Sequence, residues 1–310
     1  VRCPGASESQ QELGRERMPS LLNLFFIIFF LLESVVGILG NGFIIIVLGR
    51  EWVRCWTLPP GDMILASLGI SCFFLQWAAL VNNFSTYFSP IYRSIYLHVF
   101  WNFTNMATLW FTTWLAVFYC WRISRFILCL LLWSLLLSAF LIITVFVKIY
   151  LVFQLPVTGN YSENTPLNDR TYAFQMHFFL PLQMFILLIP FLFFLVPTIL
   201  LISSLYRHLR NMQHHSAGPQ DQSIQVHITT LKSLFFFLII PISYILSLII
   251  TVVVPISVCS SWFWVWEVVA YTGISIHPAF LILNSSKLRR ALKKILRQDR
   301  RKEDLKEGRK

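Results

Sequence analysis

Hydrophobic residues occur along the chain in long blocks, and polar or basic segments separate these blocks. A helix needs roughly 20 predominantly apolar residues to cross a hydrocarbon core about 30 Å thick, and the blocks reach that length. Because lipid offers no hydrogen-bond partners to the backbone, each block is expected to be helical. The pattern predicts an all-α fold, a seven-transmembrane helix bundle, with spans at residues 21–48, 63–84, 96–120, 126–153, 177–206, 234–254 and 263–283.

The segment after the last block has a different pattern. Apolar residues recur there with helical spacing, and the lysine and arginine residues between them fall on the opposite side of the same helix. One apolar stripe beside one cationic face is typical of a short amphipathic helix lying in the membrane interface. A span that continues into such a helix indicates an exit on the cytoplasmic side. The apolar positions are Leu288, Ala291, Leu292, Ile295 and Leu296.

The distribution of charge sets the expected orientation. The chain has 25 lysine and arginine residues against 14 acidic ones, and 56% of its 310 residues are hydrophobic. The basic residues lie between or after apolar blocks, so they indicate orientation in a membrane and no nucleic-acid partner. The positive-inside rule predicts a multi-pass plasma-membrane protein with an extracellular amino terminus and a cytoplasmic carboxyl terminus. Six basic residues would then lie outside: Arg2, Arg15, Arg17, Arg93, Lys148 and Arg170.

The polar segments divide the chain into three parts. Residues 1–20 are expected to form an extracellular tail, in which Met18 is the preferred natural start. Residues 21–284 form the helix bundle, and residues 285–310 form a cytoplasmic amphipathic helix and basic tail. The longest polar stretch between spans contains the sequon Asn160-Tyr161-Ser162, so Asn160 is a candidate glycosylation site.

The sequence lacks the motifs of enzymes and of metal sites. It contains no phosphate-binding glycine loop, no GxSxG nucleophile elbow and no HExxH motif, so neither catalysis nor a cofactor is expected. The histidines of the segment 207–232 have no zinc spacing, and no metal is expected. A transporter or channel is an open alternative, but the spans offer it few acids beyond Glu33 and Glu267.

A few polar residues interrupt the apolar blocks. Such residues normally face the bundle interior, because an unpaired polar group is costly in lipid. Trp101 and Asn105 are four positions apart and so share one face of the third span. The pattern alone favours helix packing there, with an interhelical hydrogen bond from Asn105. Asn41, His277 and Asn284 are interpreted as bundle-internal residues that set helix packing or its change on activation.

Several stretches, in order along the chain, resemble one receptor family. They are ESVVGILGNGFI at 33–44, LAVFY at 115–119, SLYRH at 204–208, residues 227–233, and His277-Pro278 followed by Asn284 and Lys287-Leu288. These stretches resemble the type 2 taste receptors, the bitter taste receptors, over about residues 21–296. The resemblance implies a seven-helix G-protein-coupled receptor that detects small bitter compounds and activates a gustducin-like heterotrimeric G protein.

The resemblance also implies roles for individual residues. Trp101 and Asn105 match positions that line the agonist pocket, and Glu267 matches a position that often contacts ligand, with a solvated acid at the helix mouth as an equal alternative. Four aromatic residues of the seventh span are further candidates to line the cavity: Trp262, Trp264, Trp266 and Tyr271. The clustered tryptophans are more often an interfacial belt. Structural or activation roles fall to Asn41, His277, Pro278 and Asn284, and G-protein-facing roles to Arg122, Arg207, Arg210 and Lys232. Attraction to membrane lipids alone would also explain those basic positions.

The chain departs from the family pattern at four places. Cys72 stands where the family usually has arginine, and Pro241 where it often has tyrosine. Pro197 occupies a position that is commonly not proline, and the loop between Arg122 and Phe126 is shorter than usual by roughly a dozen residues. Because that loop contributes to G-protein contact in the family, a degenerate, non-signalling receptor is the alternative.

Overall fold

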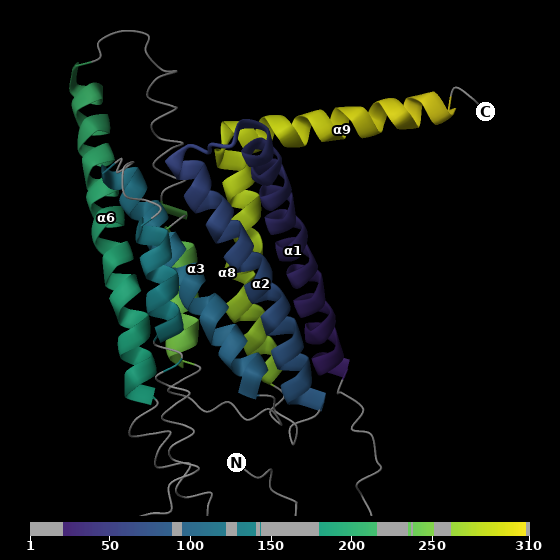
Figure 1. Ribbon diagram of the computed structural model, residues 1–310, viewed down its shortest axis with the longest axis vertical. Helices are drawn as coiled ribbons and strands as arrows, with labels where there is room; N and C mark the ends of the chain where they lie inside the picture. Colours follow the sequence, from purple (N-terminus) through teal and green to yellow (C-terminus); the bar gives the residue numbers. More distant parts are fainter. Residues whose placement is uncertain are drawn as a thin grey trace, which may run out of the picture.

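The computed structural model describes residues 21–88, 95–121, 129–140, 143, 180–215, 235–236, 238–250 and 262–307. In this part of the chain each of the seven predicted spans contains a helix and a further helix follows, so the predicted fold is confirmed (Figure 1). In chain order the helices are α1 (Leu21–Cys55), α2 (Pro60–Phe88), α3 (Ile95–Trp121), Cys129–Phe140, α6 (Leu180–His215), Leu238–Ile250, α8 (Phe263–Asn284) and α9 (Ser286–Glu307).

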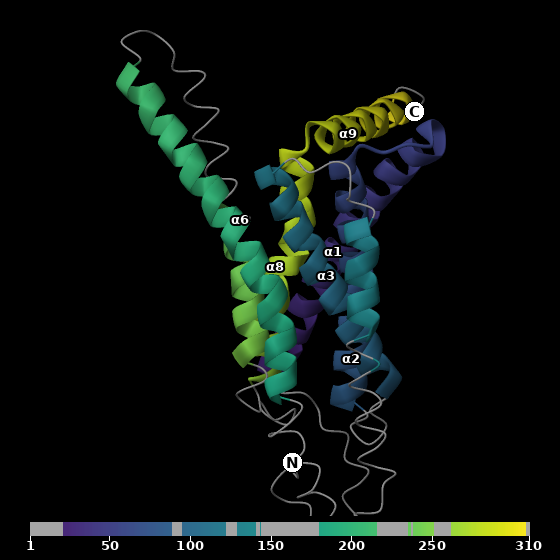
Figure 2. The same ribbon diagram turned by 60° about the vertical axis from the view of Figure 1, so that its left-hand side comes forward.

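The helices differ in how much lipid they can face. Among the described residues, α1, α8 and large parts of α2 and α6 are long and apolar enough to cross a membrane. α3 is less apolar, and its residues 104–113 are all buried, because it packs between α2 and α6 (Figure 2). A helix covered by protein can carry polar side chains that would be costly in lipid. α3 is therefore the natural place for functional polar groups.

The turn between α1 and α2 is shorter than the gap between the predicted spans at residues 21–48 and 63–84. α1 continues to Cys55, so Arg50 and Arg54 lie on the helix and not in a loop between those spans. Trp56 ends α1 in the left-handed region, with φ 55° and its N–H donating to the carbonyl of Trp52 at 2.7 Å. Pro60 suits the first position of α2, because its missing N–H would have no helical partner there.

α6 extends well past the predicted fifth span, which was expected to give way to a polar loop at Arg207. Its 36 residues correspond to a length of about 54 Å at a rise of about 1.5 Å per residue. That length exceeds a hydrocarbon core of about 30 Å, and one end of α6 projects beyond the bundle (Figures 1 and 2). Arg207 and Arg210 are exposed on this projecting part rather than in a loop.

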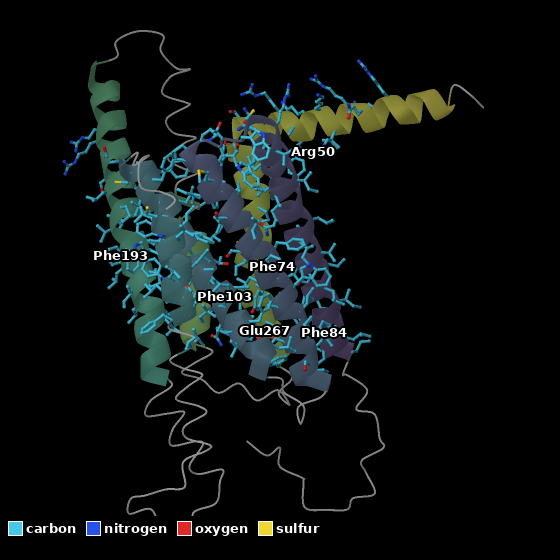
Figure 3. The ribbon with its side chains drawn as sticks, viewed as in Figure 1. Arg50, Phe74, Phe84, Phe103, Phe193 and Glu267 are labelled. Atoms are coloured by element: carbon cyan, nitrogen blue, oxygen red, sulfur yellow. The ribbon has the colours of Figure 1, made fainter. Side chains whose placement is uncertain are left out.

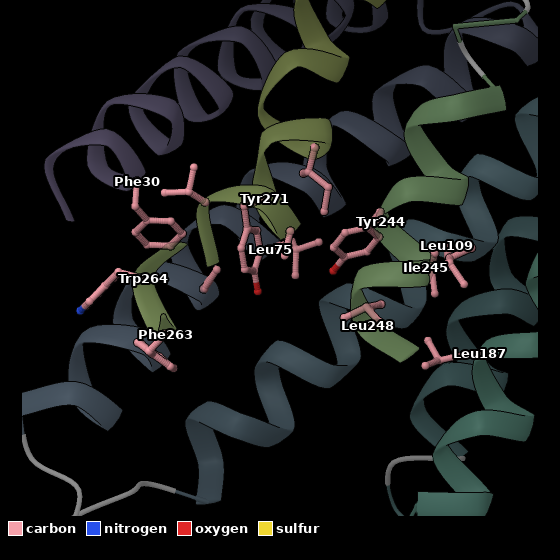
Figure 4. Packing of buried hydrophobic residues seen from close by; sticks show 14 of the residues in the cluster. Phe30, Leu75, Leu109, Leu187, Tyr244, Ile245, Leu248, Phe263, Trp264 and Tyr271 are labelled. Carbon is pink, nitrogen blue, oxygen red and sulfur yellow. The ribbon is translucent and has the colours of Figure 1, made fainter. Parts of the chain in front are cut away.

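Two clusters of buried side chains stabilise the bundle. The inner cluster, toward α9, includes Leu48 and Leu68 together with Leu288 of α9. The outer cluster lies toward the opposite end and includes Phe30, Leu187, Trp264 and Tyr271 (Figure 4). The outer cluster contains most of the buried aromatic rings near the predicted ligand residues. The apolar blocks of the sequence thus supply two buried clusters, of which the outer one is rich in aromatic rings.

Two glycines of α1 let it pack closely against α8. A Cβ atom at Gly37 would lie 2.8 Å from Nε2 of Gln76 and 3.3 Å from Cα of Ser275. A Cβ atom at Gly40 would lie 2.9 Å from Cγ of Pro278. At Gly37 the nearest atom is the end of a flexible side chain of α2, which could move, and the α8 backbone is tight at 3.3 Å; at Gly40 the neighbour is the Pro278 ring, so the requirement for glycine is strongest there. Small residues at helix contacts are a general means of packing in membranes.

α9 is a separate helix that begins at a sharp turn. Ser285 has an extended backbone with ψ 115°, and its N–H still donates to the carbonyl of Leu281 at 2.9 Å. The hydroxyl of Ser285 accepts the backbone N–H of Leu288 at 3.4 Å, the arrangement of a helix N-cap. α9 then runs across the end of the bundle at a wide angle (Figures 1 and 2). The predicted amphipathic segment is therefore helical.

Lys287 attaches the start of α9 to the ends of α1 and α2. Its Nζ lies 2.5 Å from Oε2 of Glu51 and 2.6 Å from Oδ2 of Asp62, and we call these three residues the Lys287 clamp. Burial alone lowers the pKa of Lys287, but hydrogen bonds and attraction to Asp62 and Glu51 outweigh burial and raise the pKa. Because the folded-state pKa is raised, the contribution of the clamp to stability is present at neutral pH and is lost as pH rises through that pKa.

Candidate functional site

The centre of the candidate site is the outer half of α3. The indole Nε1 of Trp101 donates a hydrogen bond to the hydroxyl of Tyr271 on α8 at 2.6 Å. One turn further along, Oδ1 of Asn105 accepts a hydrogen bond from the hydroxyl of Tyr244 at 2.7 Å. Tyr244 lies on the Leu238–Ile250 helix, so α3 is linked to two other helices. The interhelical hydrogen bond expected of Asn105 is present.

The two tyrosines form a pair across the bundle. Their ring centroids are 6.3 Å apart, and both side chains are almost fully buried. Figure 4 shows the rings on neighbouring helices with their hydroxyls pointing toward the same end of the bundle. Each hydroxyl can both donate and accept a hydrogen bond, so each retains capacity beyond its contact with α3. The four side chains therefore place aromatic faces beside hydrogen-bonding groups.

Glu267 lies one helical turn from Tyr271 on α8, on the outer side of the site (Figure 3). Its Oε2 accepts a hydrogen bond from Nδ2 of Asn83 on α2 at 2.5 Å. Glu267 is half-buried and paired with a neutral amide, which favours an interior position over a fully solvated acid. Within the described residues its carboxylate forms no ion pair with a lysine or arginine. A half-buried carboxylate held only by a neutral donor can still attract a cation.

Aromatic rings cover the space between Glu267 and α1. The ring of Phe30 lies 5.6 Å from that of Trp264 and 5.7 Å from that of Tyr271. The ring centroids of Phe84 and Tyr87 of α2 lie 5.3 and 5.2 Å from that of Trp264. Trp264 is 0% exposed and belongs to the interior, whereas Trp262 is 71% exposed. The sequence could not separate these two tryptophans.

The predicted structural residues are mostly interior. Asn41 is 0% exposed and its Nδ2 donates to the carbonyl of Gly37 at 2.9 Å. His277 is 5% exposed, and Pro278 packs against Gly40. Asn284 is exposed at the end of α8, so its predicted interior position was wrong. The cause is its place in the last turn, where the interior face of α8 gives way to the junction with α9.

Four of the sequence predictions concern residues outside the described part of the chain. These are the glycosylation site Asn160, the basic residues Arg122 and Lys232, and the shortened loop after Arg122. Arg207 and Arg210 are described and exposed near the end of α6. Their G-protein role stays a prediction.

Cys72, which stands in place of the arginine usual in the family, is part of the inner cluster. It is 1% exposed and packs with apolar side chains that include Leu68 and Phe111. Its neighbour Ser71 meets Thr108 of α3 hydroxyl to hydroxyl at 2.5 Å. α2 and α3 are thus joined here by neutral groups. Pro197 and Pro241, the other two single-residue departures, are both buried within their helices.

Three residues near the site were missed by sequence reasoning. Tyr244 and Asn83 hold Asn105 and Glu267, and Thr272 donates a hydrogen bond to Oε2 of Glu33 at 2.9 Å. Each partner comes from a helix distant in sequence, so spacing gives no signal for these pairs. Glu33 of α1 is thereby linked to α8. The described residues contain no group of three or more side chains suited to a metal ion.

Comparison with known proteins gives the family. The chain matches the family model described as taste receptor protein (TAS2R) over residues 18–300. It is 42% identical over 292 residues to taste receptor type 2 member 134 of Rattus norvegicus, covering 89% of this chain and 88% of the relative. It is 38% identical over 291 residues both to member 143 of Rattus norvegicus and to member 16 of Pan troglodytes, covering 89% of this chain and 99% of each relative. The chain therefore belongs to the type 2 taste receptors, a family of seven-helix, multi-pass G-protein-coupled receptors for bitter taste and not of enzymes.

Proposed function

We propose that this chain is a plasma-membrane receptor that binds small bitter compounds in the outer half of its bundle. The observation that carries the proposal is the set of paired side chains around Trp101, Asn105 and Glu267. Ligand sites are mostly apolar, with a few placed polar groups that fix orientation. The rings of Tyr244, Tyr271 and Trp101 supply apolar contact, while Asn105 and Glu267 supply the polar groups.

The chemistry of the site favours a particular class of ligand. A compact, largely apolar compound would contact the rings of Trp101 and Tyr271. A hydrogen-bonding group on it would reach Asn105 or a tyrosine hydroxyl, and a basic nitrogen would favour Glu267 through attraction to its carboxylate. Cations also bind to the faces of aromatic rings, which surround this side of α8. Bitter amines are therefore the first compounds to test.

The proposed signalling partner is a gustducin-like heterotrimeric G protein on the cytoplasmic side. With the carboxyl terminus inside, the projecting end of α6 lies in the cytoplasm and presents Arg207 and Arg210. Arg122 and Lys232 are assigned to the same surface, and α9 lies beside membrane lipid. The amino terminus and any glycan at Asn160 are then extracellular. This orientation follows the positive-inside rule.

Substitution of the site residues tests the proposal. In cells that express a gustducin-like G protein, Trp101→Ala and Asn105→Ala should each raise the agonist concentration for half-maximal calcium release about tenfold or more. Tenfold corresponds to about 1.4 kcal/mol of binding free energy, a modest value for a buried aromatic or amide contact. Agonists are first identified by screening bitter amines and neutral bitter compounds on the unmodified chain.

The control is a tryptophan outside the site. Trp133 on the Cys129–Phe140 helix is 69% exposed, so Trp133→Ala removes the same side chain without touching the site. All variants are compared at equal surface labelling of a tagged amino terminus. A response unchanged by Trp101→Ala and Asn105→Ala, or lowered equally by Trp133→Ala, would place the agonist elsewhere.

A further inference from the structure

α6 packs against the bundle over only part of its length. Its buried residues form a stripe that ends at Thr198, and the described side chains after Thr198 are half-buried or exposed. Figure 2 shows the projecting end of α6 diverging from the other helices. The position of that end therefore depends on the contacts that the buried stripe makes. The stripe consists of Leu187, Pro190, Phe194, Pro197 and Thr198.

Two prolines of this stripe interrupt the hydrogen-bond ladder of α6. Pro190 and Pro197 lie about two turns apart inside the helix, and each removes one backbone N–H from the ladder. Sharp bends in long helices occur mostly at such interruptions. Because both interruptions precede the projecting end, α6 can change direction between its buried part and that end.

Thr113 of α3 attaches α3 to α6 at the first of these prolines. Its hydroxyl donates a hydrogen bond to the carbonyl of Pro190, with 2.9 Å between the two oxygens. Thr113 is 1% exposed, and α3 packs against α6. The same hydroxyl lies 2.9 Å from the carbonyl of Leu109, one turn earlier on α3. Threonine has a single hydroxyl proton, so the bond to α6 and the bond within α3 compete for it.

Release of the bond between the helices leaves neither of its two groups without a partner. The hydroxyl of Thr113 keeps the carbonyl of Leu109, and the carbonyl of Pro190 keeps the N–H of Phe194, its donor within α6. Loss of a buried hydrogen bond is costly mainly when a donor or an acceptor stays unpaired. On average, one side-chain hydrogen bond between membrane helices changes an equilibrium about threefold. The contact can therefore open and close while the bundle stays folded.

Thr113 lies on the same face of α3 as the candidate site. Asn105, Leu109 and Thr113 follow one another at intervals of four residues, so their side chains lie along one stripe of the helix. Asn105 is bonded to Tyr244, and Leu109 belongs to the outer cluster. A movement of α3 at Asn105 would change the distance from Thr113 to α6. It would leave the bond from Thr113 to Leu109 intact, because that bond lies within α3.

We infer that the hydrogen bond from Thr113 to Pro190 is a latch, which holds α6 against α3 and whose release lets the projecting end of α6 move. In the closed latch the hydroxyl proton serves α6, and in the open latch it serves Leu109. Thr113 is thus a positioning residue, which acts through α6. The consequence for signalling rests on the proposed function: agonist contact at Asn105 favours the open latch, and the movement of α6 activates the G protein.

The test follows the projecting end of α6 directly. Tyr206 is 57% exposed and lies about 24 Å along α6 from Pro190. It is replaced by 4-trifluoromethylphenylalanine, and the fluorine NMR spectrum of the purified chain in lipid nanodiscs is recorded without agonist. Thr113→Val exchanges the hydroxyl for a methyl group of similar size. We expect the ratio of two α6 positions to change about threefold, the effect of one bond between membrane helices.

Neighbouring and conservative variants provide the controls. Thr112 is 7% exposed, and its hydroxyl donates within α3, to the carbonyl of Thr108 at 2.8 Å. Thr112→Val therefore loses the same group and should leave the fluorine spectrum unchanged, as should Thr113→Ser, which keeps the hydroxyl. Size-exclusion chromatography checks that each variant is folded. The latch is overturned by equal shifts in Thr112→Val and Thr113→Val, by no shift in either, or by a shift in Thr113→Ser equal to that in Thr113→Val.

Nucleotide exchange separates the latch from the proposed signalling role. With a gustducin-like heterotrimer and no agonist, Thr113→Val should raise basal exchange about threefold, because the open position is populated about threefold more. A shifted fluorine spectrum with unchanged basal exchange would support the latch and count against the proposed role of α6 in signalling. An unchanged spectrum would overturn the latch whether or not the chain signals.

Discussion

Replacing Cys72 with arginine is expected to prevent this receptor from reaching the cell surface, even though the family usually has arginine there. Cys72 is 1% exposed and lies in the inner cluster among apolar side chains. Among the described residues, the inner cluster around it contains no aspartate or glutamate. An unpaired charge in such a site costs several kcal/mol, and the larger side chain adds an overpacking cost of about 1–3 kcal/mol.

Two control variants show whether surface expression is lost because of the charge at position 72. One tests the size of the side chain alone, and the other tests an added arginine at an exposed position. Cys72→Met enlarges the side chain without a charge and should lower surface expression only moderately. Cys55→Arg adds the same charge at the exposed end of α1 and should have little effect. Surface labelling of a tagged amino terminus measures all three. Normal labelling of Cys72→Arg would show that the bundle retains a partner for arginine.

Replacing Gly40 with alanine is expected to destabilise the contact between α1 and α8. The new Cβ would lie 2.9 Å from Cγ and 3.0 Å from Cβ of Pro278, and a proline ring has no rotamer that would move these atoms away. The helices must separate, at an overpacking cost of about 1–3 kcal/mol. Thermal unfolding of the purified chain in detergent should show a transition several degrees lower.

Gly49 provides the matched control, because a Cβ there would have nothing within 4 Å. Gly49→Ala should be neutral or stabilising by up to about 1 kcal/mol, through the higher helix propensity of alanine. A second test is a partial rescue: Pro278→Ala removes Cγ, at 2.9 Å, but keeps Cβ, at 3.0 Å, so it should reduce the cost of Gly40→Ala only in part. If Gly40→Ala and Gly49→Ala unfold at the same midpoint temperature, α1 and α8 do not pack as closely as described.

The apolar blocks of the sequence were sufficient to place the helices. A helix that crosses lipid must be long enough and apolar enough to span the hydrocarbon core, and both properties can be read from the sequence. Leu288 and Leu292 likewise marked α9 by their spacing. The ends of α1 and α6 were predicted too short, since helices that leave the membrane continue into polar sequence without a change of backbone. Arg50 and Arg207 were placed in loops for that reason. Hydropathy shows where a helix leaves the lipid, but the helix itself can continue beyond that point, as α1 and α6 do.

The sequence predicted some residues of the candidate site but not their partners. The spacing of Trp101 and Asn105 showed that they share a face of α3, and the family resemblance singled out Glu267. Their partners Tyr271, Tyr244 and Asn83 depend on how each helix is rotated about its axis, which a single sequence does not specify. The exposed position of Asn284 was missed because this residue lies in the last turn of α8, at the junction with α9.

The departures from the family differ in what they imply. Cys72, Pro197 and Pro241 lie buried within helices, so the bundle accommodates them. The shortened loop after Arg122 lies outside the described residues and bears on G-protein contact. The non-signalling alternative, which rests on that loop and on the departures at Cys72 and Pro241, stays a prediction.

The most direct test of the central claim measures G-protein activation by the purified chain. The chain is placed in lipid nanodiscs with a gustducin-like heterotrimer, and agonist-stimulated nucleotide exchange on the α subunit is followed. We predict that an agonist found by screening accelerates exchange, and that Trp101→Ala shifts the required concentration upward about tenfold, the change expected from losing one good contact. Exchange that stays at the basal rate with bound agonist would contradict the account and identify a chain that binds ligand without signalling.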